Sequence, residues 1–274
     1  MTTVLVTGAT DGLGRAVAGR LARDGADVVL HGRSEERLAA AAGELERATG
    51  TRPRTVRADL ASLAEVRDLA AEVRETLPAL DVLVNNAGIG AGLPDLTTRQ
   101  ESRDGFELRF AVNHLAGFLL TLELLPLLHA SAPARVVHVA SAGQAPIDFD
   151  DPMVEHGYSG PRAYCQSKLA QIACGLELAG RLPAGDVAVT SLHPGTYMPT
   201  KIVLEEIGRS VDTLESGTDA VTRLAVAPEL AGVTGRYFDR TTPAAPHPQA
   251  TDPEARRRLW DLSVRLTGAA APPG

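Results

Sequence analysis

Thr7-Gly8-Ala9-Thr10-Asp11-Gly12-Leu13-Gly14 is the stretch that decides the fold of this 274-residue chain. Gly8 permits a tight turn, Gly12 lets the backbone approach a pyrophosphate, and Gly14 allows a helix to pack closely. A helix that begins here offers free N–H groups and the positive end of its dipole to phosphates. The stretch therefore predicts a dinucleotide site. The expected contacts within it are Gly8, Thr10, Asp11, Gly12, Leu13 and Gly14.

Outward from this turn, strand-like and helix-like segments alternate to the end of the chain. The expected strands are residues 3–7, 26–30, 54–58, 81–85, 135–140, 187–192 and 236–238. The expected helices are residues 13–23, 34–45, 62–77, 105–128, 162–181, 213–227 and 253–266, with a break near Pro126. The strands are almost continuously apolar, which is typical of a parallel sheet covered on both faces.

This pattern predicts an α/β fold, a single-domain Rossmann fold with a doubly wound parallel sheet of about seven strands and helices on both faces. The domain should cover residues 1–268, and residues 269–274 should form a flexible tail. Two long irregular loops, residues 142–161 and 195–212, follow the carboxyl ends of strands. Open α/β sheets bind ligands at that edge, so we expect these loops to surround the substrate.

The composition indicates a soluble globular protein, with 44% hydrophobic and 22% charged residues. The net charge of −7 argues against non-specific nucleic-acid binding. Cys165 and Cys174 are too few for a disulfide framework, which favours reduced thiols in the cytoplasm. No targeting segment is evident, and no metal-ligand spacing occurs among the histidines. The apolar stretch 115–128 is shorter than a membrane span and contains Pro126, so a buried helix is expected and no membrane contact.

The residues after the second strand, His31-Gly32-Arg33-Ser34, bear on the choice of cofactor. An NAD-preferring site usually has Asp or Glu here, for the ribose 2′-hydroxyl. Arg33 instead offers a cation to a 2′-phosphate, and Ser34 adds a hydroxyl at a helix N-terminus. NADP(H) is therefore favoured over NAD(H).

Tyr164 and Lys168 stand four residues apart on the helix expected at 162–181. This spacing places both side chains on one helical face. An ammonium beside a phenol favours the phenolate, so we expect Lys168 to lower the tyrosine pKa from about 10. Such a tyrosine can exchange a proton with a substrate near neutral pH.

In these motifs and their order, the chain resembles the classical short-chain dehydrogenase/reductase family over nearly its whole length. The residues that carry the resemblance are TGATDGLG at 7–14, Asp59-Leu60, Asn85-Asn86-Ala87-Gly88, Asn113, Ser141, Tyr164 with Lys168, and Pro194-Gly195. Within the family, FAVNHL at 110–115, AYCQSKLA at 163–170 and LHPG at 192–195 resemble the retinol-dehydrogenase-like and WW-domain-oxidoreductase-like branch.

The resemblance implies an oxidoreductase that exchanges a hydride between nicotinamide and a carbonyl or alcohol carbon. Tyr164 would be the general acid or base, and Ser141 would polarise the substrate oxygen. Lys168 would hold the nicotinamide ribose, and Asn113 would keep its helix open around a water linked to Lys168. The remaining cofactor contacts implied are Asp59 and Leu60 at the adenine, Asn86, Ala87 and Gly88 on the adenosine side, and Pro194, Gly195, Thr196 and Thr200 near the nicotinamide. Either threonine could be the one that reaches the carboxamide.

The resemblance leaves the substrate open. The interval from Ser141 to Tyr164 is 23 residues, longer than is common in the family, which weakens the prediction of substrates by analogy. Tyr197 and Met198 either line an apolar pocket or pack against the core. The substrate is expected to be a small, largely apolar carbonyl or alcohol. A composition rich in Gly, Ala and Arg is typical of a high-GC genome, which points to an actinomycete-type source and secondary metabolism.

Two other functions remain compatible with the same motifs. One is an enzyme of this fold with non-redox or net-neutral chemistry, such as an epimerase, dehydratase or cyclase. The other is a dinucleotide-sensing protein without catalysis, although a sensor has no need of Tyr164. Small side chains on the helix at 162–181 are compatible with a homodimer or homotetramer.

Overall fold

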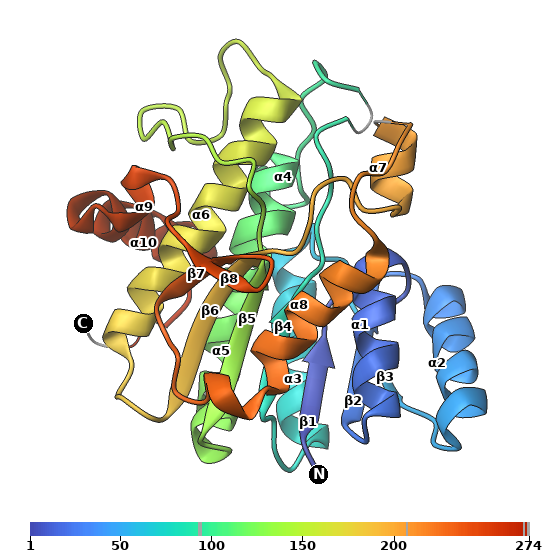
Figure 1. Ribbon diagram of the computed structural model, residues 1–274. Helices are drawn as coiled ribbons and strands as arrows, with labels where there is room; N and C mark the ends of the chain where they lie inside the picture. Colours follow the sequence, from blue (N-terminus) through green and yellow to red (C-terminus); the bar gives the residue numbers. More distant parts are fainter. Residues whose placement is uncertain (93–94, 207, 271, 273–274) are drawn as a thin grey trace.

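The computed structural model describes residues 1–92, 95–206, 208–270 and 272 of the 274-residue chain. Within these residues the protein is built on one sheet with helices on both faces (Figure 1). The α/β Rossmann fold expected from the sequence is confirmed. Residues 271, 273 and 274 of the expected tail lie outside the described residues, and Ala269, its first residue, is buried with 7% exposure.

The sheet has eight strands within the described residues, in the order β3-β2-β1-β4-β5-β6-β7-β8. All neighbours are parallel except β7 and β8. The strands are β1 (Thr3–Val6), β2 (Asp27–Gly32), β3 (Arg54–Arg57), β4 (Val82–Asn85), β5 (Ala134–Val139), β6 (Val187–His193), β7 (Arg236–Asp239) and β8 (Thr242–Ala244). The chain order reverses between β1 and β4, which is where a doubly wound sheet binds its ligand.

The main helices form two layers that bury the two sheet faces separately. Side chains of α1, α2 and α8 form one apolar core with the sheet, and those of α3, α5, α6 and α10 form the other. Successive residues of β1 point to opposite cores, Leu5 to one and its neighbours to the other. These helices are α1 (Gly12–Arg23), α2 (Glu35–Thr49), α3 (Leu63–Thr76), α5 (Ala116–Ala130), α6 (Gly160–Arg181), α8 (Leu214–Val226) and α10 (Pro253–Thr267).

Several elements differ from the sequence expectation. β8 was not expected because it has three residues and contains Pro243, which an edge strand tolerates. His31 and Gly32 belong to β2 rather than to the loop after it. The loop 195–212 is not wholly irregular, because it contains the short helix α7 (Lys201–Glu206). The other short elements are α4 (Leu108–Phe110), the π-helix η1 (Ala111–Leu115), the 3-10 helix η2 (Pro228–Leu230) and α9 (Pro248–Thr251).

The helical run from Leu108 to Ala130 begins three residues later and ends two residues later than expected, and Pro126 lies inside α5 without ending it. By length and composition this run could cross a membrane, with a mean hydropathy of 1.6 in its most apolar window. However, 72% of that window is buried inside the protein. Its apolar side chains belong to the core formed with α3 and α6, which agrees with the buried helix expected here.

Ala170, Ala173 and Gly175 of α6 face the interior of the protein. Ala170 and Ala173 are at most 2% exposed and belong to the core. A Cβ added at Gly175 would lie 3.1 Å from the His138 ring and 3.2 Å from Ser191 Oγ. Their small size is therefore explained by packing against the sheet.

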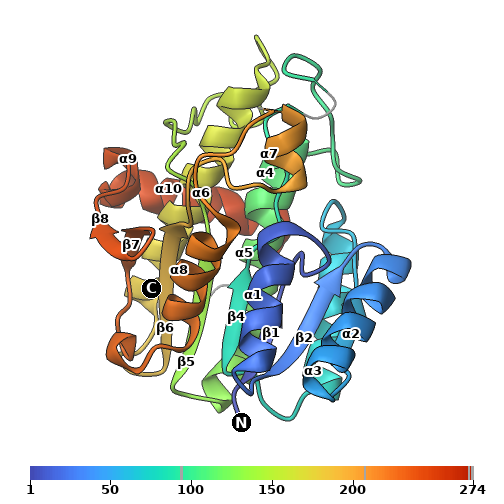
Figure 2. The same ribbon diagram turned by 45° about the vertical axis from the view of Figure 1, so that its right-hand side comes forward.

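Three segments gather above the carboxyl ends of the strands. They are the loop after β4, the loop between β5 and α6, and α7 with its flanking residues (Figures 1 and 2). Gly160 N donates to Leu96 O at 2.8 Å, which ties the start of α6 to the loop after β4. The two loops expected to surround the substrate thus lie on the ligand-binding edge of the sheet.

Candidate active site

Tyr164 and Lys168 lie one turn apart on α6, which begins after the N-cap Ser159. The spacing places both on the face that covers the end of β5, as expected. Lys168 is only 5% exposed, and its Nζ donates to the Val139 carbonyl oxygen at 3.0 Å. Nζ lies 5.9 Å from the centroid of the Tyr164 ring. The helix therefore presents the phenol and the ammonium side by side.

Ser141 follows β5 and lies beside Tyr164. Its Oγ accepts a hydrogen bond from Gly143 N at 3.0 Å, and its carbonyl accepts one from Tyr237 Oη at 3.1 Å. A Cβ added at Gly143 would lie 3.4 Å from Ser141 Oγ and 3.8 Å from Tyr164 Cε1. Gly143 therefore lies beside both the Ser141 hydroxyl and the Tyr164 ring.

Asn113 lies within the π-helix η1, where the helical run is locally widened. Its Oδ1 accepts from Ile89 N at 2.8 Å, and its Nδ2 donates to Ser167 Oγ at 3.0 Å. A Cβ added at Gly88 would lie 3.1 Å from Asn113 Oδ1 and 3.5 Å from Lys168 Nζ. Asn113 therefore joins the end of β4 to α6 next to Lys168.

Burial opposes charge on both members of the Tyr164 and Lys168 pair. It raises the pKa of Tyr164 above its usual value, and a hydrogen bond with Ser141 partly opposes this. It also lowers the pKa of Lys168 to about 8. The pKa of Tyr164 is therefore raised and not lowered as expected, because desolvation outweighs the effects that favour the phenolate.

The glycine turn has the backbone geometry that its sequence predicts. Gly8 and Gly12 have φ angles of +66° and +52°, a region that favours glycine. A Cβ at Gly14 would overlap Gly8 O and the Asn86 side chain, so only glycine lets α1 begin here. Asp11 caps α1 by accepting from Gly12 N at 2.7 Å.

The ends of β1 and β4 are joined through Thr7. Its Oγ1 accepts from Asn86 N at 2.9 Å and from Ala87 N at 3.0 Å, and its carbonyl accepts from Asn86 Nδ2 at 2.8 Å. A Cβ at Gly8 would come within 3.0 Å of Ala87 Cα. The ends of β1 and β4 are therefore in direct contact at the point where the strand order reverses.

The adenosine end of the expected site lies around the start of α2. Arg33 is exposed, and Ser34 Oγ caps α2 by accepting from Arg37 N at 3.3 Å. A hollow of about 190 Å³ beside the glycine turn is lined by Thr10, Asp11, Arg15, Arg37, Ala40, Ala41 and Glu44. Arg15 and Arg37 were not among the predicted site residues. Arg37 could have been found, because it lies one helical turn after Arg33.

Asp59 and Leu60 follow β3. Asp59 Oδ1 accepts from Ala61 N at 3.0 Å, and its Oδ2 lies 3.5 Å from Arg103 Nη2. Leu60 is 8% exposed and packs in the core beside α3. Asp59 thus lies at the edge of the sheet, whereas the Leu60 side chain is mostly buried in the core.

A hydrogen bond joins the two ends of the loop after β6, and the middle of the loop approaches the glycine turn. Thr196 N donates to Asp212 Oδ2 at 2.6 Å. A Cβ at Gly12 would lie 3.3 Å from Thr200 Cγ2, so Thr200 adjoins the turn. Pro194 and Gly195 lead out of β6 into this loop. Met198 packs against Gly217 with 7% exposure, which favours core packing over pocket lining for this residue.

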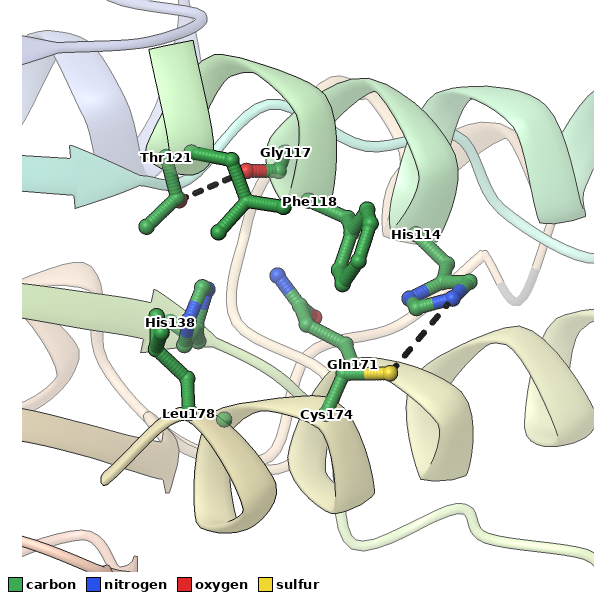
Figure 3. A pocket seen from close by; sticks show the side chains of 10 residues that line it. His114, Gly117, Phe118, Thr121, His138, Gln171, Cys174 and Leu178 are labelled. Carbon is green, nitrogen blue, oxygen red and sulfur yellow. Dashed lines mark hydrogen bonds between the residues drawn. The ribbon is translucent and has the colours of Figure 1, made fainter. Parts of the chain in front are cut away.

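A small cavity lies between α5, α6 and β5, one turn beyond Lys168 along α6 (Figure 3). Its volume is about 10 Å³, roughly what one water molecule requires. Figure 3 shows the Gln171 amide pointing into it, and Gln171 Oε1 has no hydrogen-bond partner among the described residues. Burial raises the pKa of Cys174 to about 12 and lowers that of His114 to about 3. The cavity therefore offers a neutral thiol and a neutral imidazole, not a second reactive centre.

A family model described as short chain dehydrogenase matches residues 2–207. The chain belongs to the short-chain dehydrogenase family. Retinol dehydrogenase 13 of Homo sapiens is 40% identical over 294 residues, covering 98% of this chain and 86% of that protein. Polyprenol dehydrogenase of Mus musculus is 40% identical over 284 residues, covering 97% and 83%. Among solved structures, the Pseudomonas aeruginosa RhlG/NADP active-site complex has a TM-score of 0.69 at 30% identity, covering 87% and 94%.

These matches confirm the family and its retinol-dehydrogenase-like branch. This short-chain dehydrogenase is an enzyme that acts on a CH–OH or C=O group of a small molecule with a nicotinamide dinucleotide. The residues present fit such a cofactor, because the glycine turn leads from the carboxyl end of β1 into the N-terminus of α1, at the point where the strand order reverses.

Sequence reasoning did not identify Glu206 as a residue near Tyr164. Cys165, Tyr197 and Glu206 lie close enough for their charges to raise the pKa of Tyr164, besides the larger effect of burial. Glu206 stands at the end of α7, 42 positions from Tyr164 in the sequence. No local pattern marks it, since a single glutamate in a loop is ordinarily a solvated surface residue.

Proposed function

We propose that this short-chain dehydrogenase is an NADP(H)-dependent oxidoreductase that interconverts a ketone or aldehyde and the corresponding alcohol, with Tyr164 as the general acid or base. The observation that carries the proposal is that Ser141 and Tyr164 lie together beside Gly143, with Lys168 one turn away on α6. Bound nicotinamide would supply or accept the hydride.

The chemistry assigned to Ser141 and Tyr164 follows from their position. In reduction, Ser141 Oγ and Tyr164 Oη donate hydrogen bonds to the carbonyl oxygen and so stabilise the negative charge that develops on it. Tyr164 then gives its proton to that oxygen, and in oxidation it accepts the alcohol proton. Burial keeps Tyr164 protonated in the ligand-free protein, which suits the reductive direction.

Lys168 and Asn113 would assist the proton transfer by Tyr164 without contacting the substrate oxygen themselves. Because the pKa of Lys168 is lowered to about 8, the lysine can exchange a proton near neutral pH. Asn113 fixes η1 against Ile89 and Ser167. We infer that Lys168 also holds the nicotinamide ribose and that Asn113 keeps a place for a relay water.

The preference for NADP(H) rests on the cations around the start of α2. Arg33 is exposed after β2, and Arg15 and Arg37 line the hollow beside the glycine turn. A 2′-phosphate is a dianion that guanidinium groups bind with paired hydrogen bonds. The RhlG complex with NADP is a relative that binds this cofactor.

A largely apolar substrate is supported by the side chains around the entrance. Leu96, Tyr197, Leu204 and Val211 are 54%, 43%, 50% and 62% exposed, and all four lie on the loops above the strand ends. Exposed apolar side chains clustered at one opening are typical of a site for an apolar molecule. A cytoplasmic location, the absence of membrane contact, a role in secondary metabolism and a homodimer or homotetramer stay predictions.

The proposal is tested by following NADPH consumption with a panel of ketones and aldehydes, and NADP⁺ reduction with alcohols. We expect turnover of apolar carbonyl compounds. Tyr164→Phe should lower kcat by about 100- to 10,000-fold, because the acid is removed. Its dissociation constant for NADPH should remain nearly unchanged, which shows that the variant is folded.

Two outcomes would contradict the proposal. Near-normal turnover by Tyr164→Phe would remove Tyr164 from the chemistry. Tight NADPH binding without net oxidation or reduction of any carbonyl or alcohol would favour the two other functions named above. Product analysis by mass spectrometry then separates a net-neutral enzyme, which changes its substrate, from a sensor, which does not.

A further inference from the structure

Glu206 presents a buried carboxylate oxygen for which the protein supplies no donor. Its Oε2 accepts a hydrogen bond from Ala91 N at 3.1 Å. Its Oε1 is buried and has no hydrogen-bond partner among the described residues. A buried polar atom without a partner costs roughly 1–3 kcal/mol, and more when it is charged, so it calls for an explanation such as a bound ligand.

The loop after β4 fixes the position of this carboxylate. Ala91, which donates to Glu206, accepts from Arg109 Nη2 through its own carbonyl at 2.7 Å. Arg109 is buried and also donates from Nε to Gly90 O at 2.9 Å. A Cβ at Gly92 would lie 2.9 Å from Glu206 Cγ, so the glutamate packs directly against this loop. The carboxylate is thus held in place by the loop after β4.

The same carboxylate lies near the reacting centre, because Ala91, its donor, lies against the start of α6: a Cβ added at Gly160, four residues before Tyr164, would meet Ala91 O. Its charge is one of those that raise the pKa of Tyr164, together with Cys165 and Tyr197. It stands at the end of α7, above the carboxyl ends of the strands and beside the loop after β4 (Figures 1 and 2).

We propose that Glu206 determines substrate specificity by accepting a hydrogen bond from a donor group, a hydroxyl or a protonated amine, that the substrate carries away from its reacting carbonyl. This inference rests on the proposed carbonyl chemistry and deepens it. The substrate is then not purely apolar, since one polar group pairs with Glu206 while the rest contacts apolar side chains. An ammonium would gain most, because its hydrogen bond to a carboxylate is charge-assisted.

The test compares three ketones with one carbon skeleton that carry an ammonium, a hydroxyl or a methyl group at the same position. Several such sets, with the substituent at increasing distance from the carbonyl, locate the reach of Glu206. In at least one set, the wild-type kcat/KM at saturating NADPH should be about 10- to 100-fold higher for a donor-bearing ketone than for its methyl analogue.

Glu206→Gln removes the charge but keeps an acceptor for Ala91 N. It should lower kcat/KM for the ammonium ketone at least about tenfold and leave the methyl ketone within about twofold. The hydroxyl ketone should lose less, because a hydroxyl can also accept from the new amide. Glu205→Gln is the matched control, since Glu205 is exposed and adjacent, and it should change none of the three values.

Equal wild-type kcat/KM values within every set would overturn the inference and leave the proposed function standing. An equal loss for all three ketones in Glu206→Gln, or a rise in KM for NADPH alone, would also overturn it. A separate binding arm needs no turnover. Calorimetric titration of NADPH-saturated Tyr164→Phe with the amino analogue lacking a carbonyl should show binding that Glu206→Gln abolishes. If this binding is observed but the wild-type protein turns over no ketone, the proposed function is refuted and the inference about Glu206 stands.

Discussion

The Lys168 ammonium donates its hydrogen bond to the Val139 carbonyl oxygen at 3.0 Å, and not to the phenol of Tyr164. Val139 is the last residue of β5, two positions before Ser141. The sheet therefore fixes the lysine at the base of the site, with its ammonium 5.9 Å from the centroid of the tyrosine ring. This arrangement makes Lys168 costly for stability, because a buried ammonium loses its hydration.

Lys168→Met should separate stability from activity. Methionine has a similar length and no charge, so the desolvation cost disappears, although the Val139 carbonyl loses a donor. We expect the free energy of unfolding at pH 7 to be unchanged or raised by about 1–3 kcal/mol, measured by urea denaturation. Turnover should fall by about 100-fold or more. A strongly destabilised variant would mean that the bond to Val139 outweighs the cost of the buried charge.

The cofactor preference should depend on Arg33. Arg33→Ala should raise KM for NADPH by about 10- to 100-fold and leave KM for NADH nearly unchanged, because only NADPH carries the 2′-phosphate. Added salt should weaken NADPH binding more in the wild type than in the variant. Arg47→Ala, at the exposed far end of α2, is the control. Equal effects on the two cofactors would show that Arg33 does not bind the phosphate.

Two helical glycines should respond in opposite ways to alanine. Gly14→Ala places a methyl group against Gly8 O and the Asn86 amide, so we expect a loss of about 1–3 kcal/mol in unfolding free energy and weaker NADPH binding. Gly43→Ala, in the middle of α2, meets nothing within 4 Å and should stabilise the protein by up to about 1 kcal/mol. If Gly14→Ala is as stable as the wild type, the turn is more adaptable than its packing indicates.

The parts of the fold that follow from local patterns were predictable from the sequence. Apolar runs and caps such as Ser34 and Ser62 placed the parallel strands and main helices to within a few residues. β8 and α7 were missed because elements of three and six residues carry no periodicity. Pro126 misled in the other direction, since the packing of α5 overrides its tendency to end a helix.

The candidate site was predictable only where a motif or the family resemblance marks it. Tyr164, Ser141, Lys168 and Asn113 were found in this way, and the structure brings them together. Their electrostatics were not predictable, because burial, which decides the pKa of Tyr164, is a property of the folded chain. Glu206 carries no sequence signal at all, since its importance arises from the missing partner of one oxygen.

Stability at acid pH should be limited by buried histidines, above all by the three whose pKa values are lowered most; burial also lowers the pKa of His193. Burial lowers the pKa of His31 to about 4, that of His114 to about 3 and that of His138 to about 4. The charge of Lys168 adds to the effect on His138, that of His138 adds to the effect on His114, and Asp59 and a bond to Ala58 oppose it at His31. All three should remain neutral in the native protein at pH 5.

Unfolded histidines have a pKa near 6.5, so below that pH the unfolded chain binds protons that the native protein does not. Stability should therefore be complete above about pH 7 and fall as the pH drops toward 4, by at most about 4 kcal/mol per pH unit if all three contribute. Urea denaturation between pH 7.5 and 5 measures this slope, roughly the range in which free histidine titrates. His114→Gln should reduce this slope by about 1.4 kcal/mol per pH unit, the value for one proton. His156→Gln, at an 89% exposed position, should leave the slope unchanged. A slope that is the same in the wild type and in His114→Gln would show that His114 becomes protonated inside the folded protein, where the cavity beside Gln171 would have to stabilise the charge.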